Sequence, residues 1–494
     1  MTEPNSRTGL SRRTLLGAAA AGAALSGSGS PVHAQSASDA LSPAAMREDI
    51  RLLRRAYETL HPGLYRYATP EQTAERFVRM EADCAQPMSL EAFYLRLSRL
   101  LTTVRCGHTY ANFYNQSDAV QARLFDRTDR LPFHFLWLDG RMIVTDDPTG
   151  QGLRPGDEIV RLNGRPAGEV LAALMDVARA DGGNDGKRRR LMSVQGQDGY
   201  ESFDVFYPLI FGSRARHALI VEGADGRRRS MTVAAISLAD RRAQRRQPDP
   251  GSDQPVWTME RRGDAALLTM PDWGLYDSRW DWRGWLDAEM DRLVSDGVAR
   301  LIVDIRANEG GLDCGDALAA RLTDRPIPPR SGRRLVRYRR IPEDLRPVLS
   351  TWDRSFDDWG DDASPFDDRY FTLAQSAEEG GVIAPKEPRF TGQVRVLIGP
   401  QNSSATFGFA EMMNRERLAT LWGETTGGNR RGINGGAFYF LQLPATGLEA
   451  DLPLIGYFPL EPQPDAGVEP DTPRRLTQAH IAAGRDGVLE SALA

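Results

Sequence analysis

An alternation of short apolar strands and helices after residue 256 constrains the fold more than any other feature. Residues 301–305 (LIVDI) are apolar except for Asp304, a pattern typical of a buried strand. The same alternation continues through predicted strands at 265–270, 394–398 and 438–443, and through predicted helices at 283–294, near 317–322 and from Ala405. Such a pattern predicts an α/β domain.

The residues before this domain divide into a helical part and a β-rich part. Periodic apolar residues over 44–105 predict helices, and from Leu131 short strands follow, two of them separated by a turn at Asp139-Gly140. Residues 153–164 (LRPGDEIVRLNG) resemble the strand and turn of PDZ domains, which bind peptide ends by adding a strand to a sheet edge. A turn and strand without a binding role fits them equally well.

The N-terminus has the pattern of an export signal. Ser11-Arg12-Arg13 begins a twin-arginine motif, an apolar stretch covers 15–25, and Val32-His33-Ala34 is a small-x-small cleavage site. The apolar stretch is shorter than the roughly 20 residues of a membrane-spanning helix. We predict a twin-arginine signal peptide at 1–34 and a periplasmic or secreted protein.

These patterns give an expected order of domains. A helical domain occupies 35–115, a PDZ-like domain 116–240, a polar and Pro-bearing linker 241–256, and an α/β core 257–494.

Composition argues against several classes of partner. The net charge is −5 and no dense basic tract exists, so nucleic acid is a poor candidate. The three cysteines, Cys84, Cys106 and Cys314, lack the paired spacing of zinc sites and are predicted to be buried thiols. No cofactor motif is present, so we expect neither a cofactor nor a metal, and the oligomeric state stays open.

Two segments carry residue types that acyl transfer uses. The strand at 301–305 runs into Gly310-Gly311, a turn whose bare amides can face an oxyanion. The strand ending at Ile398 is followed by small residues that open a helix at Ser404, beside the positive end of the helix dipole. Helix capping would also explain a serine there, and a tight turn would explain the glycines.

A serine nucleophile also needs a base, usually histidine or lysine. The chain has six histidines and only two lysines, Lys187 and Lys386. His108 lies in a glycine-bearing turn after the predicted helices, among small and polar neighbours. A lone histidine is more often structural, but His108 is the best base in this inventory.

Together these segments resemble the tail-specific (C-terminal processing) serine peptidase family, in particular its tricorn-like branch. Residues 304–311 (DIRANEGG) are similar to the family's D-x-R-x-N-x-G-G turn, and 404–406 (SAT) to its nucleophile motif. Further segments similar to family sequence are 423–426 (GETT), 467–471 (GVEPD) and 484–489 (GRDGVL). The resemblance implies a ClpP/crotonase-like α/β peptidase core, preceded by a helical domain and a PDZ-like β domain. It also implies that Ser404 is the nucleophile and that the amides of Gly310 or Gly311 and of Ala405 form the oxyanion hole.

The resemblance also bears on the other catalytic residues. The branch with a Ser–Lys dyad has lysine where this chain has Asn429, and Lys386 matches nothing. The tricorn-like branch has a Ser-His-Thr segment, which 107–109 (GHT) matches except for its glycine, so His108 is the implied base. The position of the branch's relay glutamate is Pro464 here, which makes Asp465 the first candidate for the third residue and Glu461 the second.

We therefore predict an exported serine peptidase that hydrolyses peptide or protein substrates by acyl transfer. An alternative is a catalytically inactive peptide- or lipid-binding protein on the same scaffold. In that protein a pocket would be lined by Trp273, Trp280, Trp282 and Trp285, although clustered tryptophans also arise from core packing. An α/β-hydrolase is disfavoured because no G-x-S-x-G surrounds a serine candidate.

Overall fold

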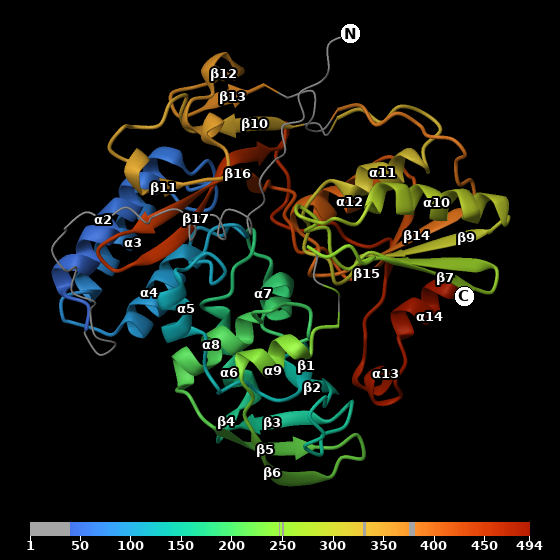
Figure 1. Cartoon of the computed structure of the whole chain (residues 1–494), viewed down its shortest axis with the longest axis horizontal. Coiled ribbons are helices and arrows are strands. Elements are labelled where there is room, and N and C mark those ends of the chain that lie inside the picture. Colours follow the sequence, from blue (N-terminus) through green and yellow to red (C-terminus); the bar gives the residue numbers. More distant parts are fainter. Residues whose placement is uncertain (1–39, 247, 249–250, 330–331, 375–380) are drawn as a thin grey trace, which may run out of the picture.

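The computed structural model describes residues 40–494 apart from 247, 249–250, 330–331 and 375–380 (Figure 1). The predicted signal peptide at 1–34 lies outside the described residues. Within the part that is described, no helix has both the length and the apolar character needed to cross a membrane.

The N-terminal part is helical, as predicted. Its helices are α2 (Pro43–Leu60), α3 (Pro70–Asp83), α4 (Leu90–Thr102) and α5 (Asp118–Leu124). Ser42, Thr69 and Ser89 cap the first three, each accepting a hydrogen bond from a first-turn amide that has no partner within the helix. Apolar residues at helical spacing point from these helices into one core cluster.

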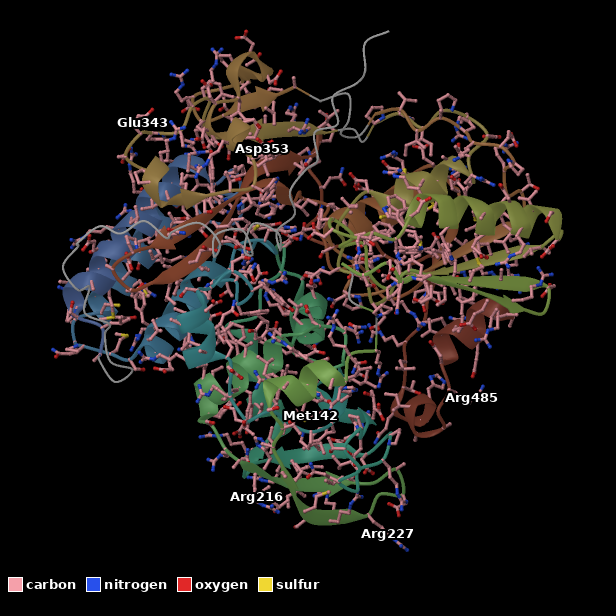
Figure 2. All side chains as sticks on the ribbon, in the orientation of Figure 1. Met142, Arg216, Arg227, Glu343, Asp353 and Arg485 are labelled. Atoms are coloured by element: carbon pink, nitrogen blue, oxygen red, sulfur yellow. The ribbon has the colours of Figure 1, made fainter. Side chains whose placement is uncertain are left out.

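An antiparallel sheet follows, with strand order β1-β2-β3-β5-β6 and β4 beside β3. The elements of this part are β1 (His134–Leu138), β2 (Arg141–Asp146), β3 (Glu158–Leu162), β4 (Arg165–Pro166), α6 (Ala167–Met175), α7 (Asp185–Leu191), α8 (Ser202–Phe211), β5 (Arg216–Glu222), β6 (Arg228–Ala234) and α9 (Leu238–Ala243). The predicted turn at Asp139-Gly140 joins β1 to β2, and both residues have positive φ. Figure 2 shows Met142 within this sheet, Arg216 at the start of β5 and Arg227 in the turn between β5 and β6.

The α/β core is built on a second sheet, with order β18-β15-β14-β9-β8-β7. Its strands run parallel except β7, and they are β7 (Thr258–Arg262), β8 (Ala265–Thr269), β9 (Arg300–Asp304), β14 (Gln393–Ile398), β15 (Thr420–Gly423) and β18 (Thr472–Pro473). Helices α10 (Trp282–Ser295), α11 (Cys314–Ala320) and α12 (Ser404–Arg415) pack on one face, α14 (Gly487–Leu493) packs on the other, and α13 (Gln478–Ala482) precedes α14. Leu301 and Val303 face the first set of helices and Ile302 faces α14, so burial on both faces explains why these three consecutive residues are apolar.

The residues of the predicted α/β core also form a third sheet. Its order is β11-β16-β17-β10-β13-β12, from β10 (Arg333–Val336), β11 (Leu349–Ser350), β12 (Ala363–Pro365), β13 (Phe371–Leu373), β16 (Asn434–Leu443) and β17 (Leu448–Phe458), with 3-10 turns at Arg346–Val348, Arg354–Asp357 and Gly360–Asp362. This sheet shares its core with α2–α5, and the Tyr57 hydroxyl donates to the Asp451 carbonyl at 2.6 Å. Part of the α/β core predicted at 257–494 thus packs on the N-terminal helices instead of on the β18–β7 sheet. The predicted strand at 438–443 exists, but it lies in the sheet that covers the N-terminal helices, because its apolar side chains are buried against them.

Two smaller predictions also have outcomes. All three cysteines are free and buried, as expected. Trp280, Trp282 and Trp285 pack against Trp257, with ring centroids 5.1–6.2 Å from it, so they build the core of the α/β part. Of the four tryptophans predicted for a ligand pocket, all of which lie in the described part of the chain, one lines the large cavity discussed below: Trp273.

Buried histidines predict acid sensitivity. His61 ends α2; its Nδ1 accepts the Gly63 amide at 3.1 Å, so its Nε2 carries the proton toward Thr109 Oγ1 at 2.7 Å. Burial lowers the pKa of His61 to about 3 and that of His134 to about 4, from an ordinary 6.5. Between those values and 6.5 the unfolded chain binds protons that the folded chain does not. The free energy of unfolding should therefore fall as pH drops through this window, by about 1.4 kcal/mol per pH unit for each histidine.

Denaturant titrations between pH 7 and pH 4 measure this dependence. We expect His61→Gln, which keeps a donor toward Thr109, to reduce the slope of stability against pH by about 1.4 kcal/mol per unit. Equal slopes for the two proteins would show that His61 is protonated in the folded state.

Candidate active site

One large cavity, of about 1170 Å³, brings the predicted site residues together. Its wall includes His108 from the N-terminal part, Gly310 and Gly311 from the segment after β9, and Ser404 and Ala405 from the start of α12. The segments after β9 and β14 leave the carboxyl ends of neighbouring parallel strands, where open α/β sheets place their ligands.

Ser404 occupies a strained position at the entry to α12. Its φ is +52°, in the left-handed region that few non-glycine residues adopt. Such strain costs about 1–3 kcal/mol and persists where the surroundings hold it. Buried Asn402 does so: its Nδ2 donates to the carbonyls of Ile305 at 2.5 Å and Asn308 at 3.0 Å, and its Oδ1 accepts the Gly399 amide at 2.8 Å. The half-buried Ser404 hydroxyl makes no hydrogen bond with any described residue.

Helix capping does not explain this pair of serines. Ser403, not Ser404, occupies the N-cap position of α12, and its side chain makes no capping bond. The Ser403 hydroxyl instead donates to the Glu309 carbonyl at 3.1 Å. The capping interpretation is therefore wrong for both residues.

The glycine turn lies directly against the nucleophile. Gly310 and Gly311 have φ of +121° and +140°, and a methyl group on Gly310 would stand 2.9 Å from Ser404 Cβ and 3.1 Å from the Ala405 nitrogen. The Gly310 amide donates to Asn308 Oδ1 at 2.9 Å, whereas within the described chain the Gly311 amide has no such partner. Ala405 is in the first turn of α12, where amides lack acceptors inside the helix. Of the two glycine amides, that of Gly311 therefore has its donor uncommitted among the described residues.

His108 is carried by a turn that buried groups fix on both sides. The Gly107 amide donates to Asp181 Oδ1 at 2.9 Å, and Thr109 contacts His61. A side chain at position 107 would meet Asp181 at 3.0 Å, which explains glycine where the family pattern has serine. The imidazole packs on Phe438 of β16, with ring centroids 5.6 Å apart, and faces the same cavity as Ser404.

Asp465, the first candidate for the third residue, contacts Asn429 and the turn at 182–183. Asp465 Oδ1 accepts Asn429 Nδ2 at 2.7 Å and the Gly183 amide at 2.9 Å. Glu461 is exposed. Asn429, which stands where the Ser–Lys branch has its lysine, is buried. Its Nδ2 donates both to Asp465 Oδ1 at 2.7 Å and to the Asp181 carbonyl at 3.3 Å.

Sequence reasoning missed a charge cluster at the edge of the site, in which Lys187 is buried. Lys187 Nζ and Arg179 Nη1 each lie 2.8 Å from Glu309 Oε1, next to the glycine turn. Lys187 was one of two lysines in the chain, but no motif or spacing connects α7 with the nucleophile more than 200 residues later. In the described part of the chain, no group of three or more His, Cys, Asp or Glu side chains has a metal-binding arrangement.

Comparison with known proteins agrees with this geometry. Residues 264–439, which contain the glycine turn and Ser404, match the family model of peptidase family S41. The matched segment, about a third of the chain, is similar to the S41 peptidases. The match supports a serine-type peptidase, a hydrolase, and this family implies peptide or protein substrates. No curated protein sequence matches the chain significantly.

Solved structures extend the similarity beyond the matched segment. Mature CPAF in complex with lactacystin superposes with a TM-score of 0.61 at 17% identity, over 91% of this chain and 97% of that chain. Mature CPAF alone gives 0.59 at 18% identity, over 91% and 96%. At this identity the likeness shows a shared fold.

Proposed function

We propose that this protein hydrolyses peptide bonds by acyl transfer, with Ser404 as nucleophile and His108 as general base. The observation that carries the proposal is Ser404 at φ +52°, its hydroxyl without a hydrogen bond to described residues, in the cavity that His108 also lines. A strained serine at a helix N-terminus is an arrangement that exposes a nucleophile.

The proposed reaction has two halves. Ser404 Oγ attacks the peptide carbonyl while His108 accepts the hydroxyl proton, and His108 then returns the proton to the leaving amine. In the second half, water attacks the acyl-serine while His108 accepts a proton from it. His108 then returns this proton to Ser404 Oγ as the acyl bond breaks, and the product carboxylic acid is released. The amides of Gly311 and Ala405 donate to the oxyanion, and removing one such donor costs on the order of 10²–10³ in rate.

The remaining features belong to the same proposal. We propose export through the twin-arginine signal at 1–34 and action in the periplasm or outside the cell.

We also propose that the β1–β6 sheet is PDZ-like and positions an extended peptide. The outer edge of β1 already pairs with Val194: the Val194 amide donates to the Phe135 carbonyl at 3.1 Å, and the Phe135 amide donates to the Val194 carbonyl at 2.8 Å. A peptide adding a strand at that edge therefore has to displace the segment around Val194.

Covalent labelling tests the proposal. The mature protein, from residue 35, is incubated with a fluorophosphonate probe, and the adduct is located by mass spectrometry. We expect the adduct on Ser404, its absence in Ser404→Ala, and labelling at least 100-fold slower in His108→Ala. Asp465→Asn should label within tenfold of the wild type, since Asp465 contacts Asn429 and Gly183.

The controls separate the alternatives. Ser403→Ala should keep the adduct on Ser404, which shows that the probe distinguishes the two serines. A folded wild-type protein that forms no adduct, yet binds peptides or lipids, would overturn the catalytic assignment in favour of a binding protein on this scaffold.

A further inference from the structure

We propose that Lys187 is a positioning residue of this active site: through the Glu309 carboxylate, it holds the glycine turn 309–311 against the turn that presents Ser404. The inference rests on the proposed function, because it concerns the geometry of the same oxyanion hole and nucleophile. Lys187 belongs to α7, in the part of the chain that precedes the α/β core.

The contacts of Lys187 join the two turns. Its ammonium is within 2.8 Å of Glu309 Oε1, 2.9 Å of the Gln401 carbonyl and 3.3 Å of Ser403 Oγ. Glu309 directly precedes Gly310, and Ser403 directly precedes Ser404. One nitrogen thus fixes the distance between the donor turn and the nucleophile turn.

The same contacts direct Lys187 to the two turns and not to the proposed nucleophile Ser404. An ammonium group has three N–H donors and no acceptor. Lys187 has three acceptors around it, and the hydroxyl among them belongs to Ser403 rather than Ser404. With its donors committed in this way, Lys187 acts through the turns that it holds.

A second cation extends the cluster to the histidine. Arg179 Nη1 donates to Glu309 Oε1 at 2.8 Å and to the Gly107 carbonyl at 2.7 Å, beside His108. The Arg179 guanidinium also stacks over Tyr110, with its carbon 4.4 Å from the ring centroid. Glu309 is therefore the group to which the histidine turn, the glycine turn and the nucleophile turn are all attached.

Lys187 is the buried member of this cluster. The Lys187 side chain is 1% exposed, and a buried charge is tolerated only where partners compensate it. Burial opposes ionisation of Glu309, but Arg179 and Lys187 outweigh burial and hold its pKa well below the ordinary range. Removing the lysine leaves Gln401 and Ser403 without their buried donor, so the two turns lose their common attachment.

α7 itself is fixed to the core at its first turn. Asn184 caps the helix, with its Oδ1 accepting the Lys187 amide at 3.1 Å. The Asn184 Nδ2 donates to the carbonyls of Thr426 at 2.8 Å and Gly428 at 3.1 Å, in the turn after β15. Lys187 is thus placed by the backbone of the same sheet whose strand ends carry the site.

Inactivation kinetics test the inference, because the probe's phosphoryl oxygen uses the same donors as the peptide oxyanion. The maximal inactivation rate and the half-saturating fluorophosphonate concentration are measured for the mature wild-type, Lys187→Met, Lys187→Arg, Glu309→Gln and Lys187→Met/Glu309→Gln proteins. Lys386→Met is the matched control, since Lys386 is a surface lysine paired with Asp287 at 2.6 Å.

We expect Lys187→Met to lower the maximal rate about 10–100-fold with the half-saturating concentration within about threefold, because small misplacements of reacting groups cost rate rather than affinity. Lys187→Arg, which keeps the charge, should stay within about fivefold of the wild type, and Lys386→Met within about twofold. The double variant should be no slower than the slower single variant, since both substitutions remove one interaction.

Three results would overturn the inference: an unchanged maximal rate in Lys187→Met, a loss confined to the half-saturating concentration, or single losses that multiply in the double variant. If Lys187→Met does not fold, Glu309→Gln decides, and an unchanged maximal rate in that variant overturns the inference. A wild-type protein that is not labelled at Ser404 overturns the proposed function instead.

Discussion

Replacing Ser404 with alanine is expected to lower kcat by about 10⁴–10⁶-fold, the range seen when a serine nucleophile is removed. The fold should survive, because the Ser404 hydroxyl has no hydrogen bond to lose among the described residues. Alanine also meets the same backbone strain at φ +52° that serine does. Hydrolysis of fluorescein-labelled casein measures the loss, and thermal unfolding checks the fold.

Ser403→Ala is the matched control for that substitution. It removes the bonds of the Ser403 hydroxyl to the Glu309 carbonyl and to Lys187, and leaves Ser404 in place. We expect kcat to fall no more than about tenfold, the equivalent of one or two hydrogen bonds. If Ser403→Ala were the inactive variant and Ser404→Ala the active one, the nucleophile would be Ser403 and its neighbour Lys187 the base.

Gly310→Ala is expected to lower kcat by about 10³-fold or more. A methyl group at this position would stand 2.8 Å from the Ser403 carbonyl, 2.9 Å from Ser404 Cβ and 3.1 Å from the Ala405 nitrogen. It would therefore occupy the space next to the nucleophile in which the oxyanion has to form. Because φ is +121°, the substitution should also cost about 1–3 kcal/mol of stability. Casein hydrolysis and denaturant unfolding measure the two effects.

Gly263→Ala separates the two effects of that substitution. Gly263 has φ +66° in the β7–β8 turn of the same core, and a methyl group there would meet nothing within 4 Å. We expect Gly263→Ala to lower stability by about 1 kcal/mol and to leave kcat within twofold. A Gly310→Ala protein that is folded and fully active would show that the oxyanion forms elsewhere.

The similarity to family S41 was visible in the sequence because its elements are local. A strand that ends in a glycine pair, or a strand followed by small residues and a helix, is set by a few consecutive residues. Ser404, Ala405 and the glycine turn were predicted on that basis, and His108 by resemblance and by the scarcity of other bases. The structure places all of them at one cavity.

The third predicted catalytic residue shows the limit of this reasoning. Asp465 was chosen by its place in an aligned motif, next to Pro464. Its side chain binds Asn429 and the Gly183 amide, because the turn at 182–183 reaches it from a distant part of the chain. The position of Asp465 next to Pro464 in the sequence therefore did not determine which groups its carboxylate contacts.

The sequence by itself determined the type of each element, the α/β character of the core and the residues of the two turns that flank the nucleophile. Periodicity, glycine and capping residues act over a few positions, so they can be read along the chain. The tertiary structure alone decided that 434–458 covers the N-terminal helices rather than extending the core sheet. It also decided that Lys187, Arg179 and Glu309 meet at the edge of the site. A buried ion pair depends on which distant segments are packed together, and no local pattern records that.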